Sequence, residues 1–225
     1  MHDIDSSRFA EMALAIGPEP DDVVAEMDEK AEAEGFPTVG PVVGGWLRLL
    51  ARAVDARRIF EFGSGFGYSA YWFAEALPAE GEIVLTEVDG DELAEAREYV
   101  ARGGYGDLAR FELGDAIETV DGYDGPFDVV LIDNEKERYV EAFEAVREKV
   151  AQGGLVLADN AMTAGPLEFE DVLALTEGGS APDAHEMSQG MADYLRRVRD
   201  DQGFETVLLP VGSGVAVSVR TETGR

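Results

Sequence analysis

Two short polar segments each follow an apolar run, and their side chains have the chemistry to bind a metal ion. Asp133 follows the run 127–132, and Asp159-Asn160 follows the run 155–158. Two carboxylates and an amide oxygen from adjacent strand ends form an all-oxygen half-shell, which suits Mg²⁺ or another divalent cation such as Ca²⁺ or Mn²⁺, and not zinc. Acids at strand ends are also common as plain surface residues, but their pairing at two adjacent ends favours a metal site.

A lysine three residues after Asp133 adds the chemistry of proton transfer. Lys136 is one of only three lysines in a chain that otherwise uses arginine. Arginine stays protonated, whereas a partly buried lysine near a cation can lose its proton and act as a general base. The alternative is a lysine that begins the following helix and pairs with a neighbouring acid. Both interpretations stay open at this point.

A glycine-rich segment, 61–70, marks a second centre of chemistry. Gly63, Gly65 and Gly67 follow the apolar run 59–62, and a helical pattern comes after them. A strand that turns into a helix through glycines brings backbone amides close to a bound nucleotide-like molecule. Glu87 ends the next apolar run, where its carboxylate can accept hydrogen bonds from a ribose. The pattern predicts a nucleoside-containing cofactor at the edge of an α/β sheet.

The identity of that cofactor depends on Glu61. The segment 65–70 also fits the dinucleotide pattern G-x-G-x-x-A, so a nicotinamide site is a competitor. A carboxylate just before the loop would repel a pyrophosphate, but it suits an ammonium group and a sulfonium. The E-x-G-x-G-x-G arrangement resembles motif I of class I S-adenosylmethionine-dependent methyltransferases. We therefore favour S-adenosylmethionine over a nicotinamide or an empty glycine turn.

Composition limits the classes of protein and site. A chain of 225 residues with 45% apolar content has material for one core. No run of eighteen apolar residues and no signal-like segment occurs, so we expect a cytoplasmic protein that does not bind a membrane. The absence of cysteine excludes disulfides and thiolate ligands, and two histidines exclude a multi-histidine metal site.

The net charge of −29 is extreme, with 47 acidic and 18 basic residues. An acidic surface for a cationic partner is one interpretation. The acids are spread along the whole chain, however, which favours adaptation to a high-salt cytoplasm, where carboxylates stay hydrated and their repulsion is screened. Nucleic acid is then an unfavourable partner at low salt.

Strand and helix patterns alternate along most of the chain, which predicts parallel strands joined by right-handed crossovers. The two last apolar runs are joined by only four residues and must pair as an antiparallel hairpin. Predicted strands cover 58–63, 82–87, 108–113, 127–132, 155–158, 204–210 and 215–219, and predicted helices cover 20–34, 41–55, 67–77, 90–103 and 136–151, with a short one after Ala116. The expected fold is a Rossmann-like α/β sheet with helices on both faces.

We expect one domain over residues 1–225. Helices within 1–55 should cover the cofactor and substrate side of a core formed by 56–225. The segment 164–190 has a broken helical pattern, with Gly178-Gly179 followed by Pro182, and we interpret it as an insertion or lid.

Taken together, the Glu61–Ala70 loop, Asp133-x-x-Lys136 and Asp159-Asn160 resemble the cation-dependent O-methyltransferase family. Its members include catechol O-methyltransferase and the caffeoyl-CoA O-methyltransferases, which have a mostly parallel seven-stranded sheet with an antiparallel C-terminal hairpin. The similarity covers about 39–163 and resumes at about 190–220. It implies that Asp133, Asp159 and Asn160 bind Mg²⁺, that Lys136 is the base, and that Asp133 takes part in catalysis.

The resemblance also implies which residues contact S-adenosylmethionine. Glu87 would hold the ribose hydroxyls with Val88 beside it, and Asp115 and Ala116 would lie against the adenine. The other expected cofactor contacts are Val39, Glu61, Gly63, Gly65, Gly67, Ser69 and Asp133.

The implied reaction is methyl transfer to one hydroxyl of a small vicinal diol of the catechol kind. This chain has Asn134-Glu135 where the mammalian catechol enzyme has an aromatic-containing segment, and only Asp183 and Glu186 are nearby candidates for that enzyme's second substrate-binding carboxylate. A hydroxylated tRNA base as substrate, or a non-catalytic S-adenosylmethionine-binding protein, are the alternatives. Because relatives are often dimers, a homodimer through the N-terminal helices is also expected.

Overall fold

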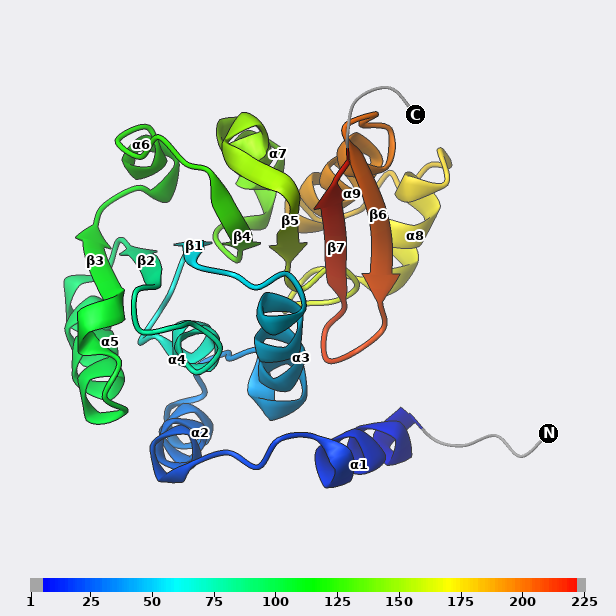
Figure 1. Ribbon diagram of the computed structural model, residues 1–225. Helices are drawn as coiled ribbons and strands as arrows, with labels where there is room; N and C mark the ends of the chain where they lie inside the picture. The colour runs from blue at the N-terminus through cyan, green and yellow to red at the C-terminus, as the bar shows by residue number, and fades with distance from the viewer. Residues whose placement is uncertain (1–5, 222–225) are drawn as a thin grey trace.

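A seven-stranded sheet forms the centre of the molecule in the computed structural model, which describes residues 6–221. The strand order is β3-β2-β1-β4-β5-β7-β6 (Figure 1). The first five strands are parallel, and β7 runs antiparallel to both β5 and β6. The predicted mostly parallel sheet with a C-terminal hairpin is confirmed. The strands are β1 Arg58–Phe62, β2 Glu82–Glu87, β3 Ala109–Leu113, β4 Phe127–Ile132, β5 Val150–Ala158, β6 Phe204–Leu209 and β7 Val215–Arg220.

Helices cover both faces of this sheet, as expected. Apolar side chains of α3, α4 and α5 pack on one face, and those of α6, α7, α8 and α9 pack on the other. The helices of the described residues are α1 Ser6–Ile16, α2 Asp22–Glu34, α3 Gly40–Ala53, α4 Tyr68–Ala74, α5 Gly90–Arg102, α6 Ala116–Val120, α7 Tyr139–Val146, α8 Phe169–Thr176 and α9 Glu186–Arg199, with short 3₁₀ helices η1 Gly106–Leu108, η2 Lys136–Arg138 and η3 Arg147–Lys149.

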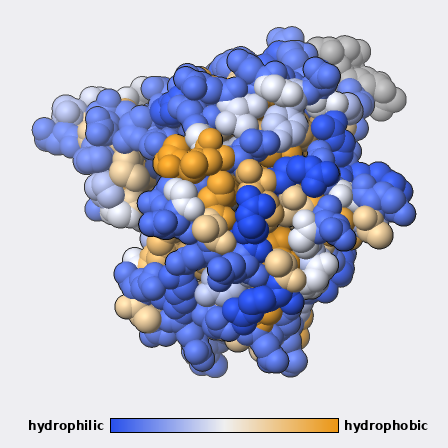
Figure 2. All heavy atoms as spheres, turned by 90° about the vertical axis from the view of Figure 1, so that its left-hand side faces the viewer, coloured by the Kyte–Doolittle hydropathy of each residue, from blue (hydrophilic) through white to orange (hydrophobic). Residues whose placement is uncertain are grey.

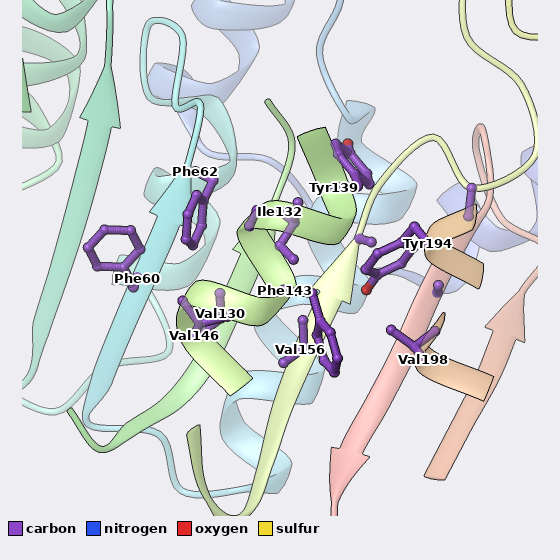
Figure 3. Close-up of a cluster of buried hydrophobic side chains, with 14 of the residues drawn as sticks. Phe60, Phe62, Val130, Ile132, Tyr139, Phe143, Val146, Val156, Tyr194 and Val198 are labelled. Atoms are coloured by element: carbon purple, nitrogen blue, oxygen red, sulfur yellow. The ribbon is translucent and has the colours of Figure 1, made fainter. Parts of the chain in front are cut away.

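The central strand β4 shows why the sheet is buried on both sides. Val130 and Ile132 point into one core and Val129 and Leu131 into the other, because successive side chains of a strand alternate between faces. All four are fully buried. Figure 3 shows the first of these cores, with Tyr139 and Phe143 from α7 and Tyr194 from α9 facing the strands.

The predicted helix over 136–151 is wrong in its extent. The structure divides it into η2, α7 and η3, and β5 begins at Val150, ahead of the predicted start at 155. Val150 pairs with Phe127, so the chain must already be extended there, and the register shifts before Leu155 pairs with Val129. Gly153, with a φ of +76°, lies inside this irregular part of the strand.

The N-terminal helices have two different environments. Val24 and Met27 of α2 pack with Trp72 of α4 in a third apolar cluster. Helix α1, which the sequence pattern did not predict, contacts α3 and leaves apolar side chains such as Phe9 and Ile16 exposed. Across the described residues, no helix is both long and apolar enough to cross a membrane.

Candidate active site

A pocket of about 860 Å³ opens at the carboxyl ends of β1, β2, β4 and β5, where open α/β sheets bind their ligands. Figure 2 shows the surface on the left-hand side of Figure 1, where hydrophobic residues gather near the centre of a mostly hydrophilic face. The pocket brings together most of the residues predicted to bind cofactor or metal. Those that line it are Val39, Gly63, Gly65, Ser69, Glu87, Val88, Asp115, Ala116, Asp133, Lys136, Asp159 and Asn160.

The glycine loop is held in place from both sides. Gly63 has a φ of +75°, and a Cβ there would lie 2.8 Å from the Asp133 carbonyl oxygen, so only glycine fits between β1 and the end of β4. On the other side, the Glu87 carboxylate accepts a hydrogen bond from the Gly65 amide (2.8 Å) and another from the Val88 amide (2.7 Å). The end of β2 therefore fixes the loop.

Two predicted cofactor residues lie behind the lining. Gly67 is at the N-terminus of α4, and Glu61 is fully buried beneath the loop. One Glu61 oxygen accepts a hydrogen bond from the Ser69 hydroxyl, and the other has no hydrogen-bond partner within the described part of the chain. Burial raises the pKa of Glu61 to about 8. Its direct contact with a cofactor stays a prediction.

Asp115 caps α6 and binds Arg138 at the same time. Its Oδ1 accepts a hydrogen bond from the Ile117 amide (2.8 Å), and its Oδ2 lies 2.6 Å from a guanidinium nitrogen of Arg138. The hydrogen bond from Arg138 lowers the pKa of Asp115 below its usual range. The ion pair joins η2 to the loop before α6 at the edge of the pocket.

Lys136 is buried and directed at oxygen atoms. Its Nζ donates hydrogen bonds to Asp133 Oδ1 (2.9 Å), the Asn134 carbonyl (3.2 Å) and Tyr139 Oη (2.7 Å). The side chain is 9% exposed, and the residue lines the pocket. Lys136 begins η2, pairs with Asp133 and also lines the pocket, and its role as a general base stays a prediction.

The predicted metal ligands follow β4 and β5, which pair side by side in the sheet, and all three line the pocket. Asp159 is 4% exposed, and its Oδ1 is buried without a hydrogen-bond partner among residues 6–221. Burial raises the pKa of Asp159 above its usual range, and the charge of Asp133 adds to this rise. Asn160 follows in the left-handed region, with a φ of +56°.

An unsatisfied carboxylate oxygen beside a second carboxylate is the kind of arrangement that a divalent cation stabilises, so these residues fit such an ion. Within the described residues, no three His, Cys, Asp or Glu side chains form a metal-binding group. The predicted set has two carboxylates completed by an amide.

Comparison with known proteins identifies the family. The model of the family described as "O-methyltransferase" matches residues 22–221, which is most of the chain. This chain belongs to the O-methyltransferase family. The predicted resemblance is therefore confirmed at the level of the family.

Relatives of this O-methyltransferase include enzymes with named substrates. The catechol O-methyltransferase of Niastella koreensis is 35% identical over 162 residues, covering 69% of this chain and 73% of the relative. The caffeoyl-CoA O-methyltransferase of Petroselinum crispum is 27% identical, covering 79% and 74%. The structure of an O-methyltransferase from Bacillus cereus in complex with SAH has the same fold, with a TM-score of 0.81, 22% identity and coverage of 95% and 97%.

Sequence reasoning missed several residues that line the pocket of this O-methyltransferase. Phe36 packs edge-on against Phe66 (4.9 Å between ring centroids), which closes the segment 35–38 over the glycine loop. Ser213 comes from the β6–β7 loop, and Met187 comes from the first turn of α9. None of these has a chemical signal in sequence. Arg138, two residues after Lys136, also lines the pocket.

The predicted lid at 164–190 contributes to the pocket only in part. Ala164 and Gly165 line it, together with Met187 from α9. Asp183 and Glu186, the nearby candidates for a second substrate-binding carboxylate, are exposed and do not line it. Within the segment, Phe169–Thr176 form α8, which packs on α9.

Proposed function

We propose that this O-methyltransferase transfers the methyl group of S-adenosylmethionine to one hydroxyl of a small aromatic vicinal diol, with Mg²⁺ as the metal ion. The observation that carries the proposal is the shared pocket. It holds the glycine loop with Glu87 on one side, and Lys136 with Asp133 and Asp159 on the other. The catechol O-methyltransferase relative and the SAH complex of the B. cereus protein support both halves of the proposal.

The cofactor half follows from the chemistry of the lining. The amides of the glycine loop and the carboxylate of Glu87 suit the polar groups of an amino acid and a ribose. Val88 is 68% exposed, so an adenine ring over it would cover apolar surface. Asp115 and Ala116 follow β3, the strand next to β2, and line the same pocket.

The acceptor half depends on Lys136. Asp133, Asp159 and Asn160 would hold Mg²⁺, which when bound lowers the pKa of a coordinated hydroxyl by its Lewis acidity. Lys136 Nζ takes the proton of the acceptor hydroxyl, for which it must be in its neutral form. The acceptor oxygen then bonds to the methyl carbon as the carbon–sulfur bond breaks, and S-adenosylhomocysteine leaves. Holding both reactants in line supplies much of the rate enhancement.

A homodimer through the N-terminal helices is part of the proposal. Phe9, Met12 and Ile16 of α1 are 62%, 65% and 80% exposed, and burial against a second copy would remove this apolar surface from water. Light scattering in multimolar KCl should give twice the mass of one chain. The Met12→Glu variant should give the mass of a single chain. The cytoplasmic location stays a prediction.

The first test combines binding with turnover. Calorimetric titration with S-adenosylmethionine in multimolar KCl should show tight binding, and labelled methyl groups should pass to catechol only when Mg²⁺ is present. Binding without transfer to any diol would redirect the search to tRNA or to a sensor role. Absence of binding would contradict the cofactor assignment.

Lys136→Ala separates chemistry from binding. We expect kcat to fall by about 100-fold or more, with the Kd for S-adenosylmethionine changed less than about twofold, because general base catalysis contributes on this scale. Lys149→Ala is the matched control, since that lysine donates to the Val120 carbonyl away from the pocket lining. An unchanged kcat in Lys136→Ala would remove this residue from the mechanism.

A further inference from the structure

Helix α9 contains a glycine at a position where helices rarely place one. Gly190 is the fifth of the fourteen residues of α9, and glycine is the weakest helix former apart from proline. Its φ is not in the left-handed region, so its backbone conformation is open to any residue. The reason for glycine must therefore be the space around it.

That space is filled by the backbone of η2. A Cβ on Gly190 would lie 2.7 Å from the Lys136 carbonyl oxygen, 2.7 Å from Glu137 Cα and 3.0 Å from the Glu137 amide nitrogen. Two of these distances are shorter than real Cβ contacts. The neighbours are main-chain atoms, which cannot swing away as a flexible side chain would. Any larger residue at 190 must push η2 and α9 apart.

The residue held in this way is the one assigned as the base. Lys136 is the first residue of η2, and its carbonyl lies against Gly190 while its Nζ lies among Asp133, Asn134 and Tyr139. A shift of the Lys136 backbone would therefore move Nζ relative to the pocket.

The same helix supports the neighbour of Lys136 one turn later. Tyr194 lies four residues after Gly190, and its ring packs edge-on against the ring of Tyr139 (5.6 Å between centroids; Figure 3). Tyr139 Oη in turn accepts the hydrogen bond from Lys136 Nζ. Both residues are fully buried. Helix α9 therefore contacts the backbone of Lys136 through Gly190 and its hydrogen-bond partner through Tyr194.

We propose that α9 sets the position of Lys136 and that Gly190 is the positioning residue that makes the close contact possible. The inference rests on the proposed role of Lys136 as base. It assigns a role in the reaction to a helix whose own side chains, apart from Met187, lie outside the pocket lining.

Gly190→Ala tests this inference directly. We expect kcat for methylation of catechol to fall by about tenfold or more, because small displacements of a reacting group have large effects on rate. The Kd for S-adenosylmethionine, measured by calorimetry, should change less than about twofold. Gly106→Ala is the matched control, since a Cβ there would make only ordinary contact, 3.7 Å from Ala101 Cα. An unchanged kcat in folded Gly190→Ala would overturn the inference.

A double-mutant cycle separates this role from general damage. If Gly190 acts through Lys136, Gly190→Ala should lower the residual rate of Lys136→Ala by less than about twofold. An equal reduction in both backgrounds, or a parallel loss of cofactor binding, would mean structural damage and contradict the inference. A wild-type rate in Lys136→Ala would instead sink the proposed base. These two failures are therefore distinguishable.

A second variant decides the matter if Gly190→Ala does not fold. Tyr194→Leu removes ring packing from the same support without adding a clash. A selective loss of kcat, with cofactor binding kept, supports the positioning role of α9. An unchanged kcat in Tyr194→Leu overturns it.

Discussion

At the scale of single residues, the buried side chain of Lys136 has hydrogen-bond partners from three residues. Three oxygen atoms accept hydrogen bonds from its Nζ, and one of them belongs to the buried hydroxyl of Tyr139. That hydroxyl is also within reach of the Asp159 carbonyl (3.3 Å). Tyr139 therefore links the lysine on η2 to the end of β5, and its hydroxyl orients Nζ.

Tyr139→Phe should lower kcat by about fivefold, since one hydrogen bond contributes about 1 kcal/mol. Cofactor affinity should stay unchanged, because Tyr139 is outside the pocket lining. Steady-state kinetics with catechol would measure the effect. Tyr123→Phe is a suitable control, since it loses a 2.7 Å hydrogen bond to Glu112, and neither residue lines the pocket. Equal activity in both variants would show that the Tyr139 hydroxyl is dispensable.

Glu87→Ala should weaken cofactor binding by about tenfold to 100-fold. The substitution removes the acceptor for the Gly65 and Val88 amides, so the glycine loop loses its support as well as the expected ribose contact. Calorimetry with S-adenosylmethionine would measure the change. Glu92→Ala, at another carboxylate of the same pocket, is the comparison. Affinity that is unaffected in Glu87→Ala would exclude this carboxylate from cofactor binding.

At the scale of elements, one buried carboxylate joins α9, η3 and the start of β6. Asp201 is 6% exposed and receives two hydrogen bonds from Arg147, both 2.9 Å long. Arg197 (2.6 Å) and the Gly203 amide (2.8 Å) complete its shell. The hydrogen bonds from Arg147 are the largest cause of a pKa far below the usual range of aspartate.

Asp201→Asn should lower the free energy of unfolding at pH 7 by about 2 kcal/mol. This is less than for a fully buried ion pair, because both arginines stay partly in water. The folded-state pKa is depressed, so the stabilisation is present above the unfolded pKa and is lost as pH falls below about 4. Urea unfolding at pH 7 and pH 3 should show the gap between wild type and variant narrowing. A gap that is independent of pH would contradict the charge pairing, and Asp200→Asn, at an exposed site, is the control.

The elements also show what could be predicted from sequence. The strand ends that hold Asp133 and Asp159 and the final hairpin were predictable, because apolar runs and a four-residue connection are local signals. The division of 136–151 was not, because it involves partners that are distant in the chain: α9 packs against η2, and Val150 pairs with Phe127. The hydrophobic periodicity of a segment reflects its local structure and does not show contacts with distant segments.

The same limit applied to the site. Carboxylates, glycines and a rare lysine can be recognised from sequence as candidate site residues. Most of the predicted site residues line the pocket. Phe36 and Met187 are apolar residues of common types, and only the folded structure shows that they line the pocket. Glu61 shows the opposite case, since its motif position is conspicuous but its side chain is fully buried.

At the scale of the whole molecule, the net charge of −29 predicts that the stability of the fold depends on salt concentration. Mutual repulsion among carboxylates destabilises the compact state. Salt weakens this repulsion, because the screening length falls from about 10 Å at 0.1 M to about 3 Å at 1 M. We therefore expect high salt to favour folding of this chain.

The melting temperature should rise steadily as KCl increases from about 0.1 M to about 3 M. Differential scanning calorimetry would measure it, and NaCl should give a similar rise because screening does not depend on the identity of the cation. A flat or falling melting temperature would contradict salt adaptation and revive the interpretation of an acidic surface for a cationic partner.

The position of β7 has a consequence for how the site is made in the cell. It is the last of the seven strands in chain order, yet it lies inside the sheet between β5 and β6. The loop before it receives hydrogen bonds from the segment after Asn160, with the Ala161 amide bound to the Gly214 carbonyl (2.8 Å) and the Met162 amide to that of Ser213 (2.9 Å). During synthesis, the glycine loop and Lys136 therefore emerge from the ribosome first. The segment beside Asp159 gains its hydrogen-bond partners only when residues 211–220 emerge.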